Sequence, residues 1–110
     1  MARFVKGDVV VVPFPFSDLT LAKRRPALVI AELKGDDLIL CQITSQKIKD
    51  KYAVSIEDND FETGALKQKS NARPNRVFTV DNHIILYRVG HLKPDKLSEV
   101  IERIVAILKQ

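Results

Sequence analysis

The chain has 110 residues, of which 45% are hydrophobic and 29% are charged, and its net charge is +4. This length predicts one domain over residues 1–110, and the composition is typical of a soluble globular protein. No apolar run approaches the ~20 residues of a membrane helix, and no export signal is present, so we expect a cytoplasmic protein without membrane contact. The single cysteine, Cys41, excludes an internal disulfide and predicts a buried thiol.

The first half of the chain predicts three strands. Val9 to Val12 forms a strand without a polar face, and the stretch Pro13-Phe14-Pro15-Phe16 ends it because neither proline donates a backbone hydrogen bond. A second strand begins near Pro26 and runs to about residue 33, and a third covers Leu38 to Thr44. The turn signal at residues 34–37 joins these two strands into a hairpin.

The second half predicts shorter strands. Tyr52 to Ile56 alternates apolar and polar residues, as a half-buried strand does. Residues 61–75 have weak periodicity and are predicted to be mostly loop. Strands are expected over residues 76–80 and 84–89, joined by a turn at residues 81–82.

The last segment changes to a helical period. Apolar residues recur at helical spacing from Leu97 to Leu108, and Pro94 suits the first turn of a helix of about four turns. Ile107 lies beside the main apolar stripe and widens it, as contact with a partner subunit would require. Short strands followed by one terminal helix predict a mainly β protein built on a small, strongly curved sheet or open barrel.

Positive charge is concentrated in three stretches that the pattern assigns to loops. They are residues 23–25, 47–51 and 67–76. The first stretch ends at Arg25, directly before Pro26, and this suggests a guanidinium held at the mouth of a rigid strand, where it suits phosphate binding. Taken alone, the stretch is explained more simply as a solvated charge cluster beside a strand.

Other kinds of site have little support in the sequence. One cysteine and two distant histidines cannot supply a zinc site at ordinary spacings, and we interpret His83 and His91 as structural. There is no glycine-rich phosphate loop and no Gly-x-Ser-x-Gly elbow. We therefore expect no metal and no cofactor.

A further pattern lies in the order of six segments along the chain. They are Gly7-Asp8-Val9, Arg25-Pro26-Ala27-Leu28-Val29-Ile30, Ile43-Thr44-Ser45-Gln46, residues 66–73, Thr79-Val80-Asp81 and Val89-Gly90-His91-Leu92. Together they resemble the MazF/PemK (Kid) family of toxins from type II toxin–antitoxin systems. The resemblance implies an SH3-like small barrel, a homodimer and a cognate antitoxin partner. It also implies metal-independent, sequence-specific cutting of single-stranded RNA, which leaves 2′,3′-cyclic phosphate and 5′-hydroxyl ends and inhibits translation and growth.

Three residues match catalytic positions of that family. Arg25 matches its catalytic arginine, Thr44 its catalytic threonine or serine at a strand end, and Arg73 a second arginine that some members use. The chemistry is reasonable, because a guanidinium binds two oxygens of a phosphate whose negative charge grows in the transition state. Thr44 can donate a hydrogen bond to a phosphoryl oxygen, and Arg73 can stabilise the leaving oxygen.

The sequence leaves the general base unassigned, because arginine, with a pKa of ~12 or more, is a poor base. Some members have an aspartate two residues after the second arginine, where this chain has Asn75, and the family's usual first loop is missing. Asp18 is the nearest carboxylate substitute, although it can equally stabilise its own turn.

RNA contacts are expected from polar and basic residues near the strand ends. They are Lys23, Arg24, Ser45, Gln46, Lys47, Lys49, Asn75 and Arg76. For the lysines, a solvated charged face is an equal alternative.

Two other functions stay open. One is a CcdB-type toxin of similar fold, which binds gyrase through its C-terminal helix and cuts nothing. The other is a nucleic-acid-binding barrel whose catalysis has decayed, for which Asn75 is the best argument. Substitution of Arg25 by alanine would abolish growth inhibition only in the nuclease.

Overall fold

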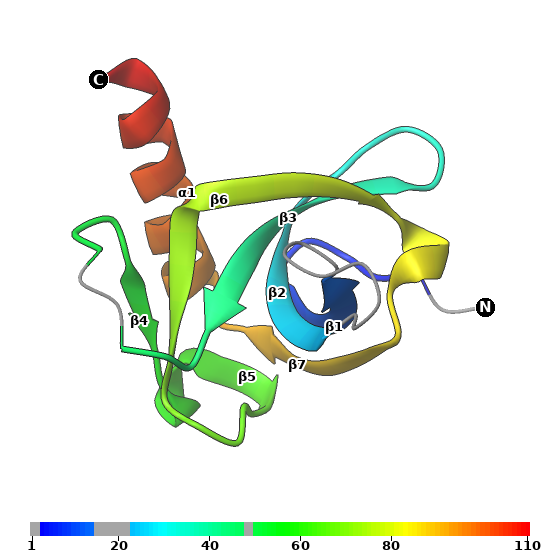
Figure 1. Cartoon of the computed structure of the whole chain (residues 1–110), viewed down its shortest axis with the longest axis horizontal. Helices are drawn as coiled ribbons and strands as arrows, with labels where there is room; N and C mark the ends of the chain where they lie inside the picture. The colour runs from blue at the N-terminus through cyan, green and yellow to red at the C-terminus, as the bar shows by residue number, and fades with distance from the viewer. Residues whose placement is uncertain (1–2, 15–22, 48–49) are drawn as a thin grey trace.

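Seven antiparallel strands form one curled sheet in the computed structural model, which describes residues 3–14, 23–47 and 50–110 (Figure 1). The strands are β1 (Asp8–Phe14), β2 (Lys23–Glu32), β3 (Asp37–Thr44), β4 (Val54–Ile56), β5 (Phe61–Gly64), β6 (Ser70–Asp81) and β7 (Tyr87–Leu92). Their order across the sheet is β4-β6-β3-β2-β1-β7-β5. Two 3-10 helices, η1 (Asp58–Asp60) and η2 (Asn82–Ile84), and the helix α1 (Pro94–Lys109) complete the described elements. The predicted mainly β fold with a C-terminal helix is confirmed.

Apolar side chains are buried on both faces of the sheet, which explains why residues 9–12 have no polar face. Side chains alternate along a strand, so Val9 and Leu28 lie on one face while Val10 and Ala27 lie on the other. Helix α1 covers the first face and packs against β4 and β6 (Figure 1). It places the fully buried Val100 there.

The helix begins with Pro94 at its first turn, as predicted. Leu97 and Ile104 are partly buried against the core, whereas Val105 and Leu108 stay exposed. Part of the apolar surface of α1 is therefore left uncovered by the sheet. In the part of the chain that the structure describes, no helix is both long enough and apolar enough to cross a membrane.

The β2–β3 hairpin is confirmed, with Leu28 paired to Cys41 across it. Its turn contains Gly35 at φ +84°, in the left-handed region that favours glycine.

Strand β1 ends at Phe14, within the predicted terminating stretch of residues 13–16. Pro13 lies inside β1, where it faces Arg24 of β2. Pairing of β1 with β7 has already stopped at Val11, so at Pro13 the strand has a partner on one side only. A residue without an N–H is tolerated at such an edge.

The basic residues before Pro26 lie in a strand, so the predicted loop there is wrong. Strand β2 begins at Lys23, and Arg25 pairs with Val12 of β1. Pairing with β1 therefore extends β2 three residues towards the N-terminus from Pro26, whose own partner is Val11.

The segment 61–75 is also more ordered than predicted, because it holds β5 and the first half of β6. A β-bulge explains its weak periodicity. Cys41 of β3 pairs with Val77 of β6, and Ile43 pairs with Ala72, so residues 73–76 all stand opposite Gln42. The segment 84–89 contains less strand than predicted. Its first residue belongs to η2, and β7 starts only at Tyr87.

Strands β5 and β7 approach each other closely where Gly64 faces Gly90. Gly64 has φ +73°, and a Cβ atom there would overlap the carbonyl oxygen of Val89. A Cβ atom on Gly90 would lie 2.6 Å from the carbonyl oxygen of Thr63. The two strands can pair at this distance only with glycine at both positions.

A buried carboxylate joins the first strand to the last. The Asp8 side chain is fully buried, and its Oδ2 accepts a hydrogen bond from the backbone N–H of Val5 at 2.8 Å. Its Oδ1 lies 2.8 Å from Nδ1 of His91, and Nη1 of Arg88 lies 3.5 Å from Oδ2. His91 therefore has the structural contact expected of it.

Candidate functional site

Arg25 and Thr44 lie on adjacent strands, on the same face of the sheet and at the same end. Arg25 shares its face with Ala27, and Thr44 shares its face with Gln42, because side chains alternate. Ala27 and Gln42 are the last directly paired residues of β2 and β3 at this end. Arg25 and Thr44 each stand two residues beyond that pair, so the sheet brings together the predicted arginine and threonine.

Within residues 3–14, 23–47 and 50–110, one set of cations at this end of the sheet has no acidic partner. We call this set the basic edge, and it consists of Lys23, Arg24, Arg25, Lys47 and Arg76. Positive charge that no carboxylate compensates attracts polyanions and remains available to bind them. The basic edge is therefore suited to phosphate groups.

Thr44 is largely buried beside this edge. Its side-chain Oγ1 accepts a hydrogen bond from the backbone N–H of Gln46 at 3.2 Å, which leaves its own hydroxyl proton free to be donated. Ser45 and Gln46 follow it and are both exposed. The β3 end thus offers one positioned hydroxyl and two accessible polar side chains.

Asp50 is a site residue that the sequence analysis missed. A backbone hydrogen bond from Tyr52 at 2.9 Å is the main cause that lowers the pKa of its carboxyl group. The Arg73 guanidinium, with Nη2 3.4 Å from Oδ2, and a hydrogen bond from the Asn75 side chain lower that pKa further. A lone acidic residue within a lysine-rich stretch was the available signal, but its partners lie more than twenty residues along the chain.

Arg73 is held in place by Asp50, whereas Arg25 has no acidic partner among the described residues. The Arg73 side chain is 20% exposed, and its Nε is buried without a hydrogen-bond partner among the described residues. Its backbone carbonyl accepts a hydrogen bond from Sγ of Cys41 at 3.2 Å. Burial raises the pKa of the Cys41 thiol to about 12, so the predicted buried thiol is confirmed.

Two predicted site residues, Asp18 and Lys49, lie outside the described residues. The candidate base and one of the expected RNA contacts therefore have no structural description.

Among the described residues, a larger and a smaller groove adjoin the basic edge. The larger, which we call the wide groove, has a volume of about 470 Å³. It is lined by Val11, Arg24, Pro26, Ser45, Ala65, Leu66, Lys67, Gln68, Ser70, Tyr87 and Val89. The smaller, which we call the bulge groove, has a volume of about 300 Å³. It is lined by Gln42, Asn75, Arg76, Val77 and Phe78.

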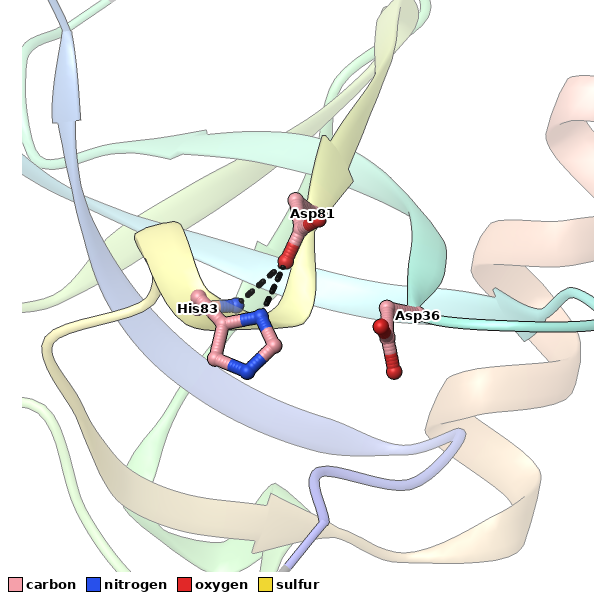
Figure 2. Close-up of side chains that lie close together, drawn as sticks. All are labelled: Asp36, Asp81 and His83. Atoms are coloured by element: carbon pink, nitrogen blue, oxygen red, sulfur yellow. Dashed lines mark hydrogen bonds and ion pairs between the residues drawn. The ribbon is translucent and has the colours of Figure 1, made fainter.

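The opposite end of the β2–β3 hairpin carries a different charge cluster. Asp36, Asp81 and His83 are exposed, and each offers one ligand atom within 4.8 Å of the others. Figure 2 shows His83 and Asp81 turned towards each other, with Nδ1 2.7 Å from Oδ1, while Asp36 stands apart. Hydrogen bonds from the His83 backbone and then from its ring lower the pKa of Asp81. Nη1 of Arg3 lies 3.7 Å from Oδ1 of Asp36, and we call these four residues the hairpin-end cluster.

Known proteins resemble this chain over nearly its whole length, both in sequence pattern and in fold. The family model for the PemK-like, MazF-like toxin of type II toxin–antitoxin system matches residues 5–108. MazF from Deinococcus radiodurans superposes with a TM-score of 0.76 at 19% identity over 100% of both chains. An endoribonuclease in complex with its cognate antitoxin from a mycobacterial species superposes with a TM-score of 0.73 at 13% identity, over 99% of this chain and 96% of that chain.

The Mycobacterium tuberculosis toxin MazF-mt6 gives a TM-score of 0.72 at 14% identity, over 93% of this chain and 96% of that one. No curated protein matches the chain by sequence. At these identities the superpositions show a common fold, and the predicted MazF-type fold is confirmed.

Proposed function

The chain belongs to the PemK-like, MazF-like family of toxins of type II toxin–antitoxin systems, and from this premise we propose that it is a metal-independent, sequence-specific endoribonuclease. Its substrate is single-stranded RNA, and cutting of messenger RNA stops translation and growth. The observation that carries the proposal is Arg25, which has no acidic partner among the described residues and lies on the same face and at the same end of the sheet as Thr44.

In the proposed reaction, the 2′-oxygen of one nucleotide attacks the neighbouring phosphorus. The bond from phosphorus to the 5′-oxygen breaks, which leaves a 2′,3′-cyclic phosphate, and the leaving oxygen takes a proton from water to become the 5′-hydroxyl end. Negative charge grows on the phosphoryl oxygens, and Arg25 binds two of them at once. The Thr44 hydroxyl donates a third hydrogen bond to the same group.

Arg73 is proposed to stabilise the leaving oxygen. The Asp50 carboxylate, paired with Arg73 at 3.4 Å, fixes the position of that guanidinium. A lowered pKa makes Asp50 a weak base, and the carboxamide of Asn75 is no base at all. Asp18 stays the proposed acceptor of the 2′-proton.

RNA and an antitoxin are the proposed partners in the cytoplasm. RNA backbone phosphates bind the basic edge, with further contacts from Ser45, Gln46, Lys49 and Asn75. A neighbouring mycobacterial structure contains a cognate antitoxin, and an acidic segment of such a partner would be attracted to the same charges. A homodimer would cover the apolar side chains that α1 leaves exposed, such as Leu108.

The decisive experiment incubates the wild-type protein with a long unstructured RNA in excess EDTA and maps the new 5′ ends. Arg25→Ala is the test variant, and Arg3→Ala is the matched control, because it removes an arginine from the far end of the hairpin. We expect discrete cuts with 5′-hydroxyl ends from the wild type and from Arg3→Ala, and none from Arg25→Ala. Intact total cellular RNA in cells whose growth has stopped would overturn the proposal and favour a gyrase-type protein target.

A further inference from the structure

We propose that the bulge groove binds one nucleobase of the RNA substrate, next to the cleaved phosphate, and that the side-chain amide of Gln42 selects this base. The inference rests on the proposed function and adds a specificity-determining residue to it.

The bulge in β6 creates the space for a base. Residues 73–76 stand opposite Gln42 alone, so regular pairing between β3 and β6 is interrupted there. Bulges of this kind turn side chains away from the sheet and are frequent beside active sites. The resulting volume of about 300 Å³ lies at the lower end of the range for small-ligand pockets, ~300–1,000 Å³.

The lining supplies the chemistry that reads a base. Gln42 carries a donor and an acceptor, and its amide makes no side-chain hydrogen bond within the part of the chain that the structure describes. Arg76 is exposed and unpaired there too. Amide and guanidinium groups recognise the edges of bases through paired hydrogen bonds.

Asn75 adds a second amide to the lining of the groove. It is exposed and carries both a donor and an acceptor group, so it can pair with the edge of a base beside Gln42.

An apolar wall completes the groove. Val77 and Phe78 line it, and the ring of Phe78 packs against Phe14 with centroids 4.9 Å apart at an interplanar angle of 64°. Unstacked bases of single-stranded RNA bind to surfaces of this kind, where apolar or aromatic contact accompanies hydrogen bonds to the base edge.

The position of the groove links it to the cleavage site. Gln42 precedes Thr44 by two residues on the same face of β3, a separation of about 7 Å along a strand. One nucleotide spans such a distance, so a base bound at Gln42 belongs to a nucleotide that flanks the phosphate held by Arg25 and Thr44.

The test measures base preference at each position around the cut, with an RNA library randomised over that region. Gln42→Leu removes both hydrogen-bonding groups, whereas Gln42→Glu keeps the shape and leaves acceptors only. Gln110→Leu, the same change at the end of α1, is the matched control. We expect Gln42→Leu to flatten the preference at one position adjacent to the cut by about tenfold. Gln42→Glu should change the preferred base there, and Gln110→Leu should change nothing.

Each outcome distinguishes the inference from the proposed function. If the wild type cuts no RNA, both fail. If the wild type cuts and both Gln42 variants keep its preferences at every position, only the base-binding groove is wrong. Equal slowing on all sequences by both variants assigns Gln42 a structural role and also overturns the inference. If Gln42→Leu fails to fold, as judged by its thermal unfolding midpoint, Gln42→Glu and the exposed Arg76→Ala decide the question.

Discussion

Both ends of the β2–β3 hairpin carry charged side chains, but the hairpin-end cluster pairs its charges, whereas the basic edge does not pair its charges within the described residues. In the hairpin-end cluster, Arg3 lies near Asp36, and Asp81 bonds to His83. At the basic edge, no cation has an acidic partner in the described ranges. Charges that are paired within the protein have little left to offer a ligand, whereas unpaired cations on a rigid sheet favour an external anion. The pairing of charges, more than their number, separates the two ends.

We expect the greatest loss of RNA cleavage from removing Arg25, the arginine on the same face as Thr44. Arg25→Ala should lower the single-turnover cleavage rate by about 10³-fold, the loss typical of one donor to the transition-state oxygens. Arg24→Ala, one residue away on the opposite face, should cost less than about tenfold, because it contributes only to RNA binding. Equal losses in the two variants would mean that charge, and not position, matters at this edge.

A buried pairing should matter more to stability than an exposed one. Asp8→Ala removes the partner of His91 and of the Val5 N–H from a fully buried position, so it should lower the free energy of unfolding by about 3 kcal/mol. Asp36→Ala breaks an exposed pair and should cost less than about 1 kcal/mol. Urea unfolding at neutral pH measures both, and similar losses would contradict the assignment of Asp8 as the joint between the terminal strands.

The salt dependence of RNA binding tests whether the cations of the basic edge bind phosphate groups. Binding of a 2′-deoxy analogue that cannot be cut should weaken with salt, and each phosphate-binding cation contributes about 0.7 to the log–log slope. Lys47→Ala should reduce the slope by about that amount, whereas Lys34→Ala in the hairpin turn should leave it unchanged. An unchanged slope for Lys47→Ala would favour the solvated-face interpretation of this lysine.

The ion pair between Asp50 and Arg73, near the basic edge, should have the smallest effect, and it should change the free energy of unfolding only at acidic pH. The pKa of Asp50 is lower in the folded protein than its ordinary value of ~3.9, so its stabilising contribution is complete above that value and is lost as the pH falls through the folded pKa. Between about pH 5 and pH 2, wild-type stability should therefore fall more steeply than that of Asp50→Asn. Parallel curves would show that the Tyr52 N–H and the Arg73 guanidinium do not stabilise the Asp50 carboxylate in the folded protein.

Local patterns predicted the elements whose structure depends on near neighbours. The apolar period from Leu97 to Leu108 and the glycine turn at Gly35 each specify their element with few long-range contacts. The start of β2 was misplaced because pairing with β1, a tertiary contact, overrides the local signal of Pro26.

The site was predictable only in part for the same reason. Arg25 and Thr44 were found through a resemblance, while Gln42 and Asp50 were not, because a bulge and a contact across the chain give them their surroundings. The bulge shows in the sequence only as weak periodicity, and the contact only as one aspartate among lysines, and neither signal identifies the partner residues.

The contact of Gly64 with Gly90 has a consequence for genetics. Cells that survive expression of an active toxin carry mutations that inactivate it, and such mutants can be collected by plating alone. Every single-base change at the first two positions of a glycine codon introduces a side chain or a stop, and β5 cannot pair with β7 around an added side chain. Survivors should therefore accumulate mutations at these two codons as readily as at the codon for Arg25, although neither glycine lies on the basic edge.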